Sequence, residues 1–477
     1  MTQLVAQSLV SSERVVSRGM DDFLAGLRRC GMGRCSTLSG LDQNRARQNS
    51  KAAPLRADVA ILMTVQTPQP VESLDSPQSS IHRGSFRRFW GTRGLSSLSF
   101  QMLAVAIGWH MYALTHSAFA LGLVGLAQFL PMFALTLVVG HVADRYDRRR
   151  IIAVCQSIEA LAAGIFLLGT LGGWLTAPAI YALAAGVGAA RAFEAPCVAS
   201  LLPAVVPRSE LPRATALSSS ANQVAQILGP ACGGVLYGVD PSAVYLACFI
   251  GFLAAAGLVV SIPLRAKPVS RAPVTFESVF SGIAFIRRDP VILGALSLDL
   301  FAVLFGGATA LLPIFARDVL LTGPWGLGAL RSAPAAGALI GTLWFARFPL
   351  RTRPGAAMLG GVIVFGAATI VFGLSTNFFV SLVALATLGA SDVISVVVRS
   401  SLVQLRTPDD MLGRVSAVNS LFIGTSNQLG EFESGITAGW WGARAAVLVG
   451  GVGTIGITLL WMKLFPPLLQ VRSFERE

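Results

Sequence analysis

The sequence predicts an all-α membrane protein with twelve transmembrane helices in two pseudo-symmetric six-helix bundles. Three observations support this fold class. The 477 residues are 53% hydrophobic and only 13% charged, with a mean hydropathy of +0.66, whereas soluble domains carry about 25% charged residues. Apolar stretches of transmembrane length recur after Arg93, and the second half of the chain partly repeats the first. Such a chain is expected to face lipid.

Each apolar stretch has roughly the length that a helix needs to cross a hydrocarbon core of about 30 Å at 1.5 Å per residue. Open strands are excluded, because lipid cannot satisfy the polar groups at their edges. The expected spans are residues 95–114, 119–140, 151–171, 178–202, 214–237, 243–263, 291–316, 325–346, 356–374, 378–403, 415–438 and 444–464.

The repeat has a fixed offset of 201 residues. Gly188 matches Gly389, and Arg213 matches Arg414, with further identities over about 45 residues in one register. The repeat predicts an N-terminal bundle at residues 86–264 and a C-terminal bundle at residues 291–477, with parallel topology. In transporters built from such repeats, the binding site lies near the bilayer midplane between the halves.

The segments outside the two bundles are more polar. Residues 1–85 are rich in Ser, Gln, Pro and Arg, so we expect a disordered tail. An alternative is that translation starts at Met63, which would make residues 1–62 a mis-annotated start. No signal peptide is expected. Residues 265–290 form a predicted linker, either with an amphipathic helix on the membrane surface or as a plain connection with one short helix.

The basic residues predict the orientation. About 23 Lys and Arg residues of the flanking segments and loops fall on one side of the predicted membrane and 2 on the other. The positive-inside rule then predicts that both termini and the linker are cytoplasmic, in a bacterial inner membrane. The net charge of +13 does not indicate nucleic-acid binding, because the basic residues lie in short clusters between apolar runs.

Several other functional classes are disfavoured. The six cysteines include no CxxC pair, so we expect no metal site, and no cofactor is indicated. The sequence has no GxxxxGK[ST] loop, so an enzyme or an ATP-driven pump is not expected. The expected partners are lipid, protons and a small-molecule substrate, and we expect a monomer.

The densest charge cluster follows the second span, in the segment GHVADRYDRRR. Its pattern of Gly140, Asp144, Arg145, Arg148 and Arg149 resembles the loop signature between spans two and three of the major facilitator superfamily. Glycine lets helices approach closely, and a carboxylate can pair with arginine or cap a helix. The resemblance implies a gate that holds the two halves together at the cytoplasmic side. A simple basic anchor is the alternative.

The resemblance to this superfamily covers about residues 86–465. Within it, the chain resembles most the drug and siderophore exporters grouped around the enterobactin exporter. The segment RTPDDMLGRVSAVNS is typical of that group. One residue departs from the gate signature, because Asp147 stands where the family usually has Gly. The added carboxylate is expected to alter the loop.

A second motif lies in the fifth span, where Gly229, Pro230, Gly233 and Gly234 resemble the GPxxGG core of the family's antiporter motif. Proline removes a backbone donor, and the glycines allow tight contact between helices. The glycines that the family has upstream are absent. The resemblance favours export over import.

Charged residues inside spans are costly and indicate function. Arg191 and Glu194 share one face of the fourth span, Asp392 lies in the tenth and Asp299 in the seventh. The resemblance implies that these spans line the cavity, so we expect Glu194, Asp392 or Asp299 to carry the coupling proton. Arg191 would compete with the proton for Glu194, or it would hold an anionic substrate group. The alternative is a structural Arg191–Glu194 pair. Arg399 is expected to extend to the cytoplasmic surface.

These features predict a secondary active transporter that exports a small amphipathic molecule, a drug or a siderophore, by proton-coupled alternating access. The rest of the cavity is expected to be apolar, which suits such a solute. The alternatives are an importer or facilitator in the same fold and a membrane sensor without transport activity.

Overall fold

The computed structural model describes residues 77–263, 276–348 and 353–471, which are helical apart from short connections. From His82 onward the chain forms one compact unit, to which the description below refers. Residues 1–76 of the predicted tail and residues 264–275 at the predicted linker lie outside the described residues. The first described helix begins at Pro77, so helical structure starts before the expected end of the tail at residue 85.

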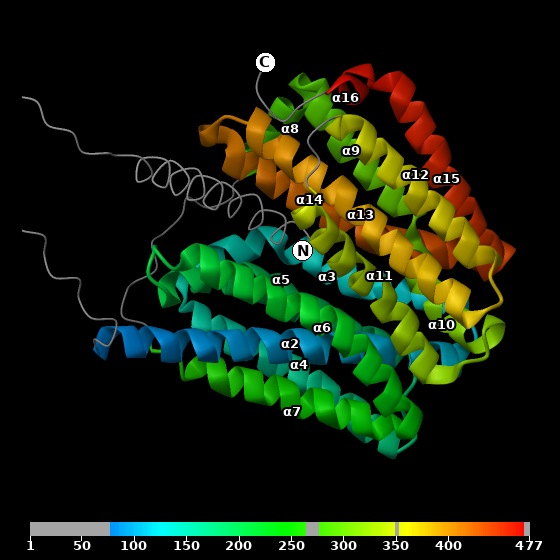
Figure 1. The fold of residues 1–477 in the computed structure, drawn as a ribbon. Helices are drawn as coiled ribbons and strands as arrows, with labels where there is room; N and C mark the ends of the chain where they lie inside the picture. The colour runs from blue at the N-terminus through cyan, green and yellow to red at the C-terminus, as the bar shows by residue number, and fades with distance from the viewer. Residues whose placement is uncertain (1–76, 264–275, 349–352, 472–477) are drawn as a thin grey trace, which may run out of the picture. The chain divides into compact units, whose positions relative to one another are not determined.

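The first half holds six long helices, grouped together in Figure 1. Their ends follow ordinary capping chemistry. Asp147 and Asp240 accept hydrogen bonds from the backbone N–H groups of Arg149 and Ser242, in the first turns of the third and sixth of these helices, which satisfies donors that the helix itself cannot. The helices are α2 (Pro77–Thr115), α3 (Ala118–Arg145), α4 (Arg148–Leu171), α5 (Ala177–Val205), α6 (Leu211–Val239) and α7 (Pro241–Val260).

The second half begins with a short helix in the predicted linker and continues with six spans. The first of these spans is a composite of helical segments, and the other five are continuous helices. The elements are α8 (Phe276–Arg288), α9 (Pro290–Phe305), η1 (Gly307–Leu311), α10 (Leu312–Ile314), η2 (Phe315–Val319), α11 (Gly323–Arg347), α12 (Pro354–Leu374), α13 (Phe378–Arg406), α14 (Asp409–Trp441), α15 (Ala443–Leu464) and α16 (Pro466–Gln470).

The composite span differs from the single helix expected at residues 291–316. The α-helix is interrupted at the consecutive glycines Gly306 and Gly307, which leave the backbone free to bend. At Gly307 the chain lies directly against α14, where a Cβ atom would come within 2.4 Å of the Gly430 carbonyl oxygen. Close contact between this span and α14 therefore requires a residue without a side chain.

The two halves pack in the same way. In the first half, α3 contacts α5, and α4 contacts both α5 and α7. In the second half, the corresponding pairs are α11 with α13, and α12 with both α13 and α15. This equivalence agrees with the pseudo-symmetry that the sequence repeat predicts.

Two helix pairs join the halves: α6 packs on α11, and α3 packs on α14. Small residues bring both pairs close together. A Cβ on Gly234 would lie 2.8 Å from the Cα of Gly328, and a Cβ on Gly435 would lie 2.6 Å from the Cα of Gly122. Packing between membrane helices depends on such residues because lipid is as apolar as the helices themselves.

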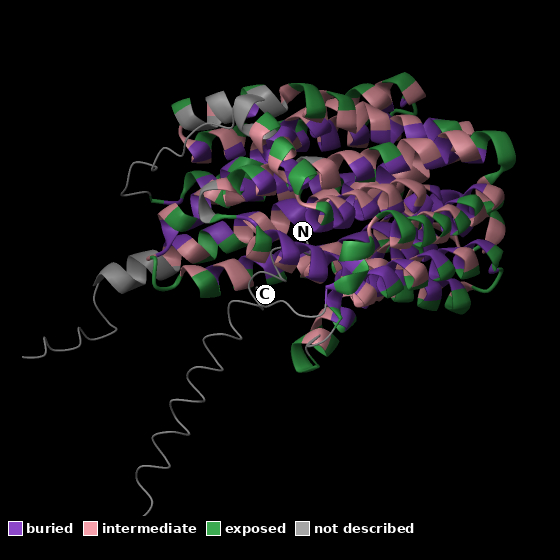
Figure 2. Ribbon diagram, turned by 90° about the horizontal axis from the view of Figure 1, so that it is seen from above, coloured by how far each residue is buried: buried purple, intermediate pink, exposed green. Residues whose placement is uncertain are grey.

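The outer faces of the helices suit a lipid environment. Leu161 and Leu168 of α4 are each 62% exposed, and Figure 2 shows buried and exposed positions alternating around the helices. By length and composition, seven helical segments of the described chain are apolar enough to cross a membrane, within α3, α4, α7, α9–η2, α12, α13 and α15. The other long helices are less apolar, and three of them, α6, α11 and α14, contribute to the contact between the halves.

The turn between α3 and α4 carries the unexpected Asp147. Its carboxylate accepts from the backbone N–H of Arg149 at 2.9 Å and pairs with the Arg149 guanidinium at 2.7 Å. The hydrogen bond from the Arg149 side chain is the main reason why the pKa of Asp147 lies below its usual range. Arg149 also donates to the carbonyl of Ile262 just beyond α7. Asp147 thus links the start of α4 to the end of α7 through one arginine.

We predict that Gly234→Leu destabilises the packing of the halves, whereas Gly238→Leu does not. A side chain at Gly234 would collide with the backbone of α11, while nothing lies within 4 Å of a Cβ at Gly238 on the same helix. Overpacking of this kind costs about 1–3 kcal/mol. The readout is thermal unfolding of the purified protein with a thiol-reactive dye, because Cys155, Cys197 and Cys248 are buried. Equal melting of the two variants would contradict the packing described here.

We also predict that Asp147→Ala destabilises the protein by about 1 kcal/mol, because loss of an N-cap costs about 0.5–2 kcal/mol. Asp147→Asn should lower the stability by less, because asparagine can still cap the helix. Some loss remains, because asparagine cannot form the ion pair with Arg149. The pKa of Asp147 is lowered in the folded state, so the stability from ionisation is present above its unfolded pKa and is lost as the pH falls through its folded pKa. Melting curves across this acidic range should show wild type and Asp147→Asn converging. A constant difference would contradict the ion pair.

Candidate functional site

The buried charged side chains of the central helices form two clusters, one in each half. The first cluster, called here the N-half cluster, consists of Ser96, Gln156, Glu159, Arg191 and Glu194 on α2, α4 and α5. The second, the C-half cluster, consists of Asp299, Asp392, Ser395 and Arg399 on α9 and α13. Three of the four charged site residues predicted within the spans, Arg191, Glu194 and Asp299, have charged partners in their own half.

Glu194 is the best-satisfied acid of the N-half cluster. Its Oε1 accepts hydrogen bonds from Ser96 at 2.8 Å and from Gln156 at 2.9 Å, and its Oε2 accepts from Arg191 at 2.8 Å. The structural Arg191–Glu194 pair, considered as an alternative from the sequence, is present.

Glu159 completes this cluster and was not among the predicted site residues. It lies on α4 with no exposed surface, and its Oε1 is 3.9 Å from the Nε of Arg191. Its position in the middle of an expected span is a signal that the rule used for Glu194 could have detected. Arg191 also lies over the ring of Phe100 at 4.2 Å, which is a cation–π contact.

In the C-half cluster, Asp299 of α9 forms an ion pair with Arg399 of α13. Arg399 is only 2% exposed, so the expectation that it extends to the surface is wrong. Its guanidinium turns inward because Asp299 supplies a counter-charge there, and this removes the cost of burying either charge alone.

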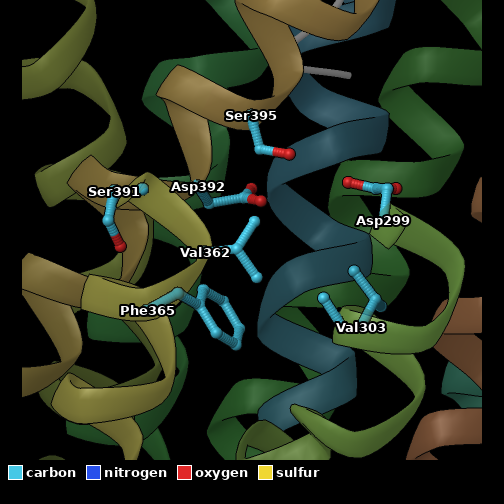
Figure 3. Close-up of a pocket in the computed structure, with 9 residues that line it drawn as sticks. Asp299, Val303, Val362, Phe365, Ser391, Asp392 and Ser395 are labelled. Carbon is cyan, nitrogen blue, oxygen red and sulfur yellow. The ribbon is translucent and has the colours of Figure 1, made fainter. Parts of the chain in front are cut away.

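Asp392 lies beside this ion pair, in a small pocket between α9, α12 and α13. Figure 3 shows the polar atoms of Asp392 and Ser395 directed toward Asp299 across the pocket. Val362 and Phe365 of α12 also line it. Among the described residues, the Asp392 carboxylate has no hydrogen bond or ion pair, and so it differs from Glu194 and Asp299.

The two clusters occupy equivalent places with different chemistry. At the offset of 201 residues, Arg191 corresponds to Asp392 and Glu194 to Ser395. The N-half cluster therefore holds an internal arginine at the place where the C-half cluster has an acid. Of the two clusters, only the C-half cluster holds an acid without a cation beside it among the described residues.

The described part of the predicted gate makes its contacts within the first half. Arg148 donates to the carbonyl of Ser200 on α5, and Arg149 donates to Ile262 beyond α7, while Arg145 is exposed. The Asp144 side chain and the surroundings of Gly140 lie outside the described part of the structure. The role of these two residues in a gate stays a prediction.

The predicted antiporter motif lies in the middle of α6. Gly229 and Gly233 face α2, where a Cβ on Gly233 would lie 2.9 Å from the Cα of Met102. Gly234 faces α11 of the other half, and Pro230 lies inside the helix between them. The motif therefore packs one helix against two neighbours at once, while its role in export stays a prediction.

A further contact joins the halves at the end opposite the loop between α3 and α4. Tyr112, near the end of α2, donates a hydrogen bond to Asp318 of η2. The guanidinium of Arg317 lies 5.9 Å from the Tyr112 ring. Deeper in, Gln223 of α6 donates to the carbonyl of Ala335 on α11. These contacts hold the halves together from that end to the middle of the helices.

The family comparison agrees with this geometry. A family model described as transmembrane secretion effector matches residues 75–474. The enterobactin exporter EntS of Citrobacter koseri is 27% identical over 398 residues, covering 82% of this chain and 94% of that protein. EntS of Escherichia coli O1:K1 is 25% identical over 401 residues, with the same coverage of both chains.

Solved structures show the same fold. A bacterial homologue of the human lysosomal transporter Spinster, inward-facing and unoccupied, has a TM-score of 0.64 at 14% identity and covers 82% of this chain and 98% of its own. The nucleoside transporter NupG has a TM-score of 0.57 at 13% identity and covers 80% and 99%. The chain is thus a multi-pass membrane transporter that belongs to the transmembrane secretion effector family of the major facilitator superfamily.

Proposed function

We propose that this protein is a proton-coupled exporter of a small amphipathic molecule, a siderophore or a drug, and that it works by alternating access as a monomer. The relatives named as enterobactin exporters support the class of substrate and the direction. The family description as a secretion effector supports the direction as well. The observation that carries proton coupling is the Asp392 carboxylate, which lines an internal pocket without a cationic partner among the described residues.

The surroundings of Asp392 favour a proton. A carboxylate removed from water needs a cation, hydrogen-bond donors or a proton to offset the lost hydration. The nearby Arg399 is already engaged by Asp299. Protonation is therefore the simplest way to neutralise Asp392. It regains its charge when its pocket opens to a compartment of higher pH.

This behaviour gives a cycle for export. In the inward-open state Asp392 releases its proton to the cytoplasm, and the substrate binds. After the halves rock, the substrate leaves outward, and Asp392 takes up a proton from the more acidic exterior. The neutral pocket then favours the return to the inward-open state, because the negative charge of Asp392 no longer has to move with the helix through a closed interior. Each half of the cycle is driven by the difference between the inward-open and outward-open states in their affinity for substrate and proton.

The basic loops support the orientation that this cycle needs. The loop between α3 and α4 and the other arginine-rich connections would face the cytoplasm, together with both termini. The contacts of Tyr112 with Asp318 and of Gln223 with Ala335 then lie on the outer side and in the middle. We assign this conformation to a state closed to the exterior.

We predict that everted membrane vesicles containing this protein accumulate iron-free enterobactin when a proton gradient is imposed, and that a protonophore abolishes the accumulation. Asp392→Asn should lower gradient-driven accumulation at least tenfold, because the amide cannot exchange a proton. Binding of enterobactin to the purified variant should persist, since the amide has nearly the same size and shape as the carboxyl group. Accumulation would be followed by mass spectrometry of the vesicle contents.

Asp240→Asn is the matched control. Asp240 caps α7 through Ser242 in an exposed turn, so the same substitution there should leave transport unchanged. Full accumulation by Asp392→Asn would contradict its role in coupling. Accumulation only in vesicles of native orientation would favour import, and accumulation that a protonophore does not affect would exclude proton coupling. A drug panel in the same vesicles would identify a substrate other than a siderophore.

A further inference from the structure

Glu159 is the most deeply buried acid in the described part of the chain that no step of the proposed cycle uses. Its side chain has no exposed surface, and neither carboxylate oxygen has a hydrogen-bond partner among the described residues. An ionised carboxylate in such a place would have lost its hydration without replacement. A neutral, protonated carboxyl group avoids this cost.

The two acids of the N-half cluster compete for one arginine. The Nη1 of Arg191 is 2.8 Å from Oε2 of Glu194, whereas its Nε is 3.9 Å from Oε1 of Glu159. Glu194 also receives hydrogen bonds from Ser96 and Gln156. Ser96, Gln156 and Arg191 therefore all donate to Glu194, and Glu159 is left with the more distant side of the guanidinium.

Among the residues that the structure describes, the groups around Glu159 supply no second counter-charge. On α5 the charged residues are Arg191 and Glu194, and on α4 itself Cys155 is the nearby titratable group. Arg93 of α2 interacts electrostatically with Arg191 and Glu194. The third neighbour, α7, carries no Asp, Glu, Lys, Arg or His in its sequence PSAVYLACFIGFLAAAGLVV.

We propose that Glu159 is a proton-binding site of the first half, and that Glu159, Arg191 and Glu194 together hold one proton that is shared through the arginine. In the arrangement of the structure, Glu159 is the neutral acid and Glu194 is the carboxylate paired with Arg191. In the alternative arrangement, Arg191 pairs with Glu159 and the proton resides on Glu194. The number of protons and the net charge are equal in both.

The exchange requires only a small movement. The guanidinium already lies between the two carboxyl groups, and a shift of about 1 Å brings Nε into hydrogen-bond distance of Glu159. The Arg191 side chain is 29% exposed, so one side of the guanidinium is not covered by the described residues. The place of this site in transport rests on the proposed function, whereas the protonation of Glu159 does not.

The test is infrared spectroscopy of the full-length protein in lipid at neutral pH, where a protonated carboxyl group gives a carbonyl band distinct from that of a carboxylate. Glu159→Gln should remove one such band. Glu194→Gln should remove the same band, because Arg191 then has Glu159 as its remaining carboxylate in the cluster and ionises it. A purely structural role for Glu159 predicts no such dependence on Glu194.

Asp392→Asn serves as the comparison, because it should leave the Glu159 band in place and remove any band of its own. An unchanged carboxyl region in Glu159→Gln would overturn the proposal. Persistence of the Glu159 band in Glu194→Gln would overturn it as well, since the two acids would then not share one proton. Loss of transport in Asp392→Asn tests the proposed function alone, so the two can fail separately.

Discussion

An ionisable side chain inside a membrane-spanning helix has to be neutralised where it lies, because hydrocarbon provides no water to hydrate it. This constraint determines how the central helices face one another. The pair of Asp299 and Arg399 joins α9 to α13, and Glu194 joins α5 to α2 and α4. Removing one partner of a buried pair typically costs about 3–5 kcal/mol. The clusters therefore act as structural connections as well as candidate proton sites.

The repeat preserves the places of the polar groups but not their identities. Arg191 and Glu194 of the first half correspond to Asp392 and Ser395 of the second. An arginine within the first cluster keeps its charge balance internal. In the second half the arginine lies two turns further along α13, and Asp299 engages it. Asp392 is consequently left without a cation among the described residues, although the helices of the two halves pack alike.

Sequence reasoning predicted the spans well, because the hydrocarbon core imposes length and apolarity on every helix. It also predicted that Arg191 and Glu194 share a face, since the helical repeat sets that relation within one segment. The pair of Asp299 and Arg399 depends on the rotation of two distant helices, which local spacing does not determine. Glu159 was missed although it lies within a span. Uncharged partners such as Gln156 were passed over because the search within the spans was for charged residues.

The loop between α3 and α4 shows how one substitution redistributes charge without changing the fold. Asp147, where the family usually has glycine, caps α4 and engages Arg149. Arg149 also binds the Ile262 carbonyl and Arg148 binds the Ser200 carbonyl, so both arginines are committed to the first half. A carbonyl at a helix end attracts cations through the helix dipole. Contact across this end with the second half would therefore have to compete with the carbonyl partners that both arginines already have in the first half.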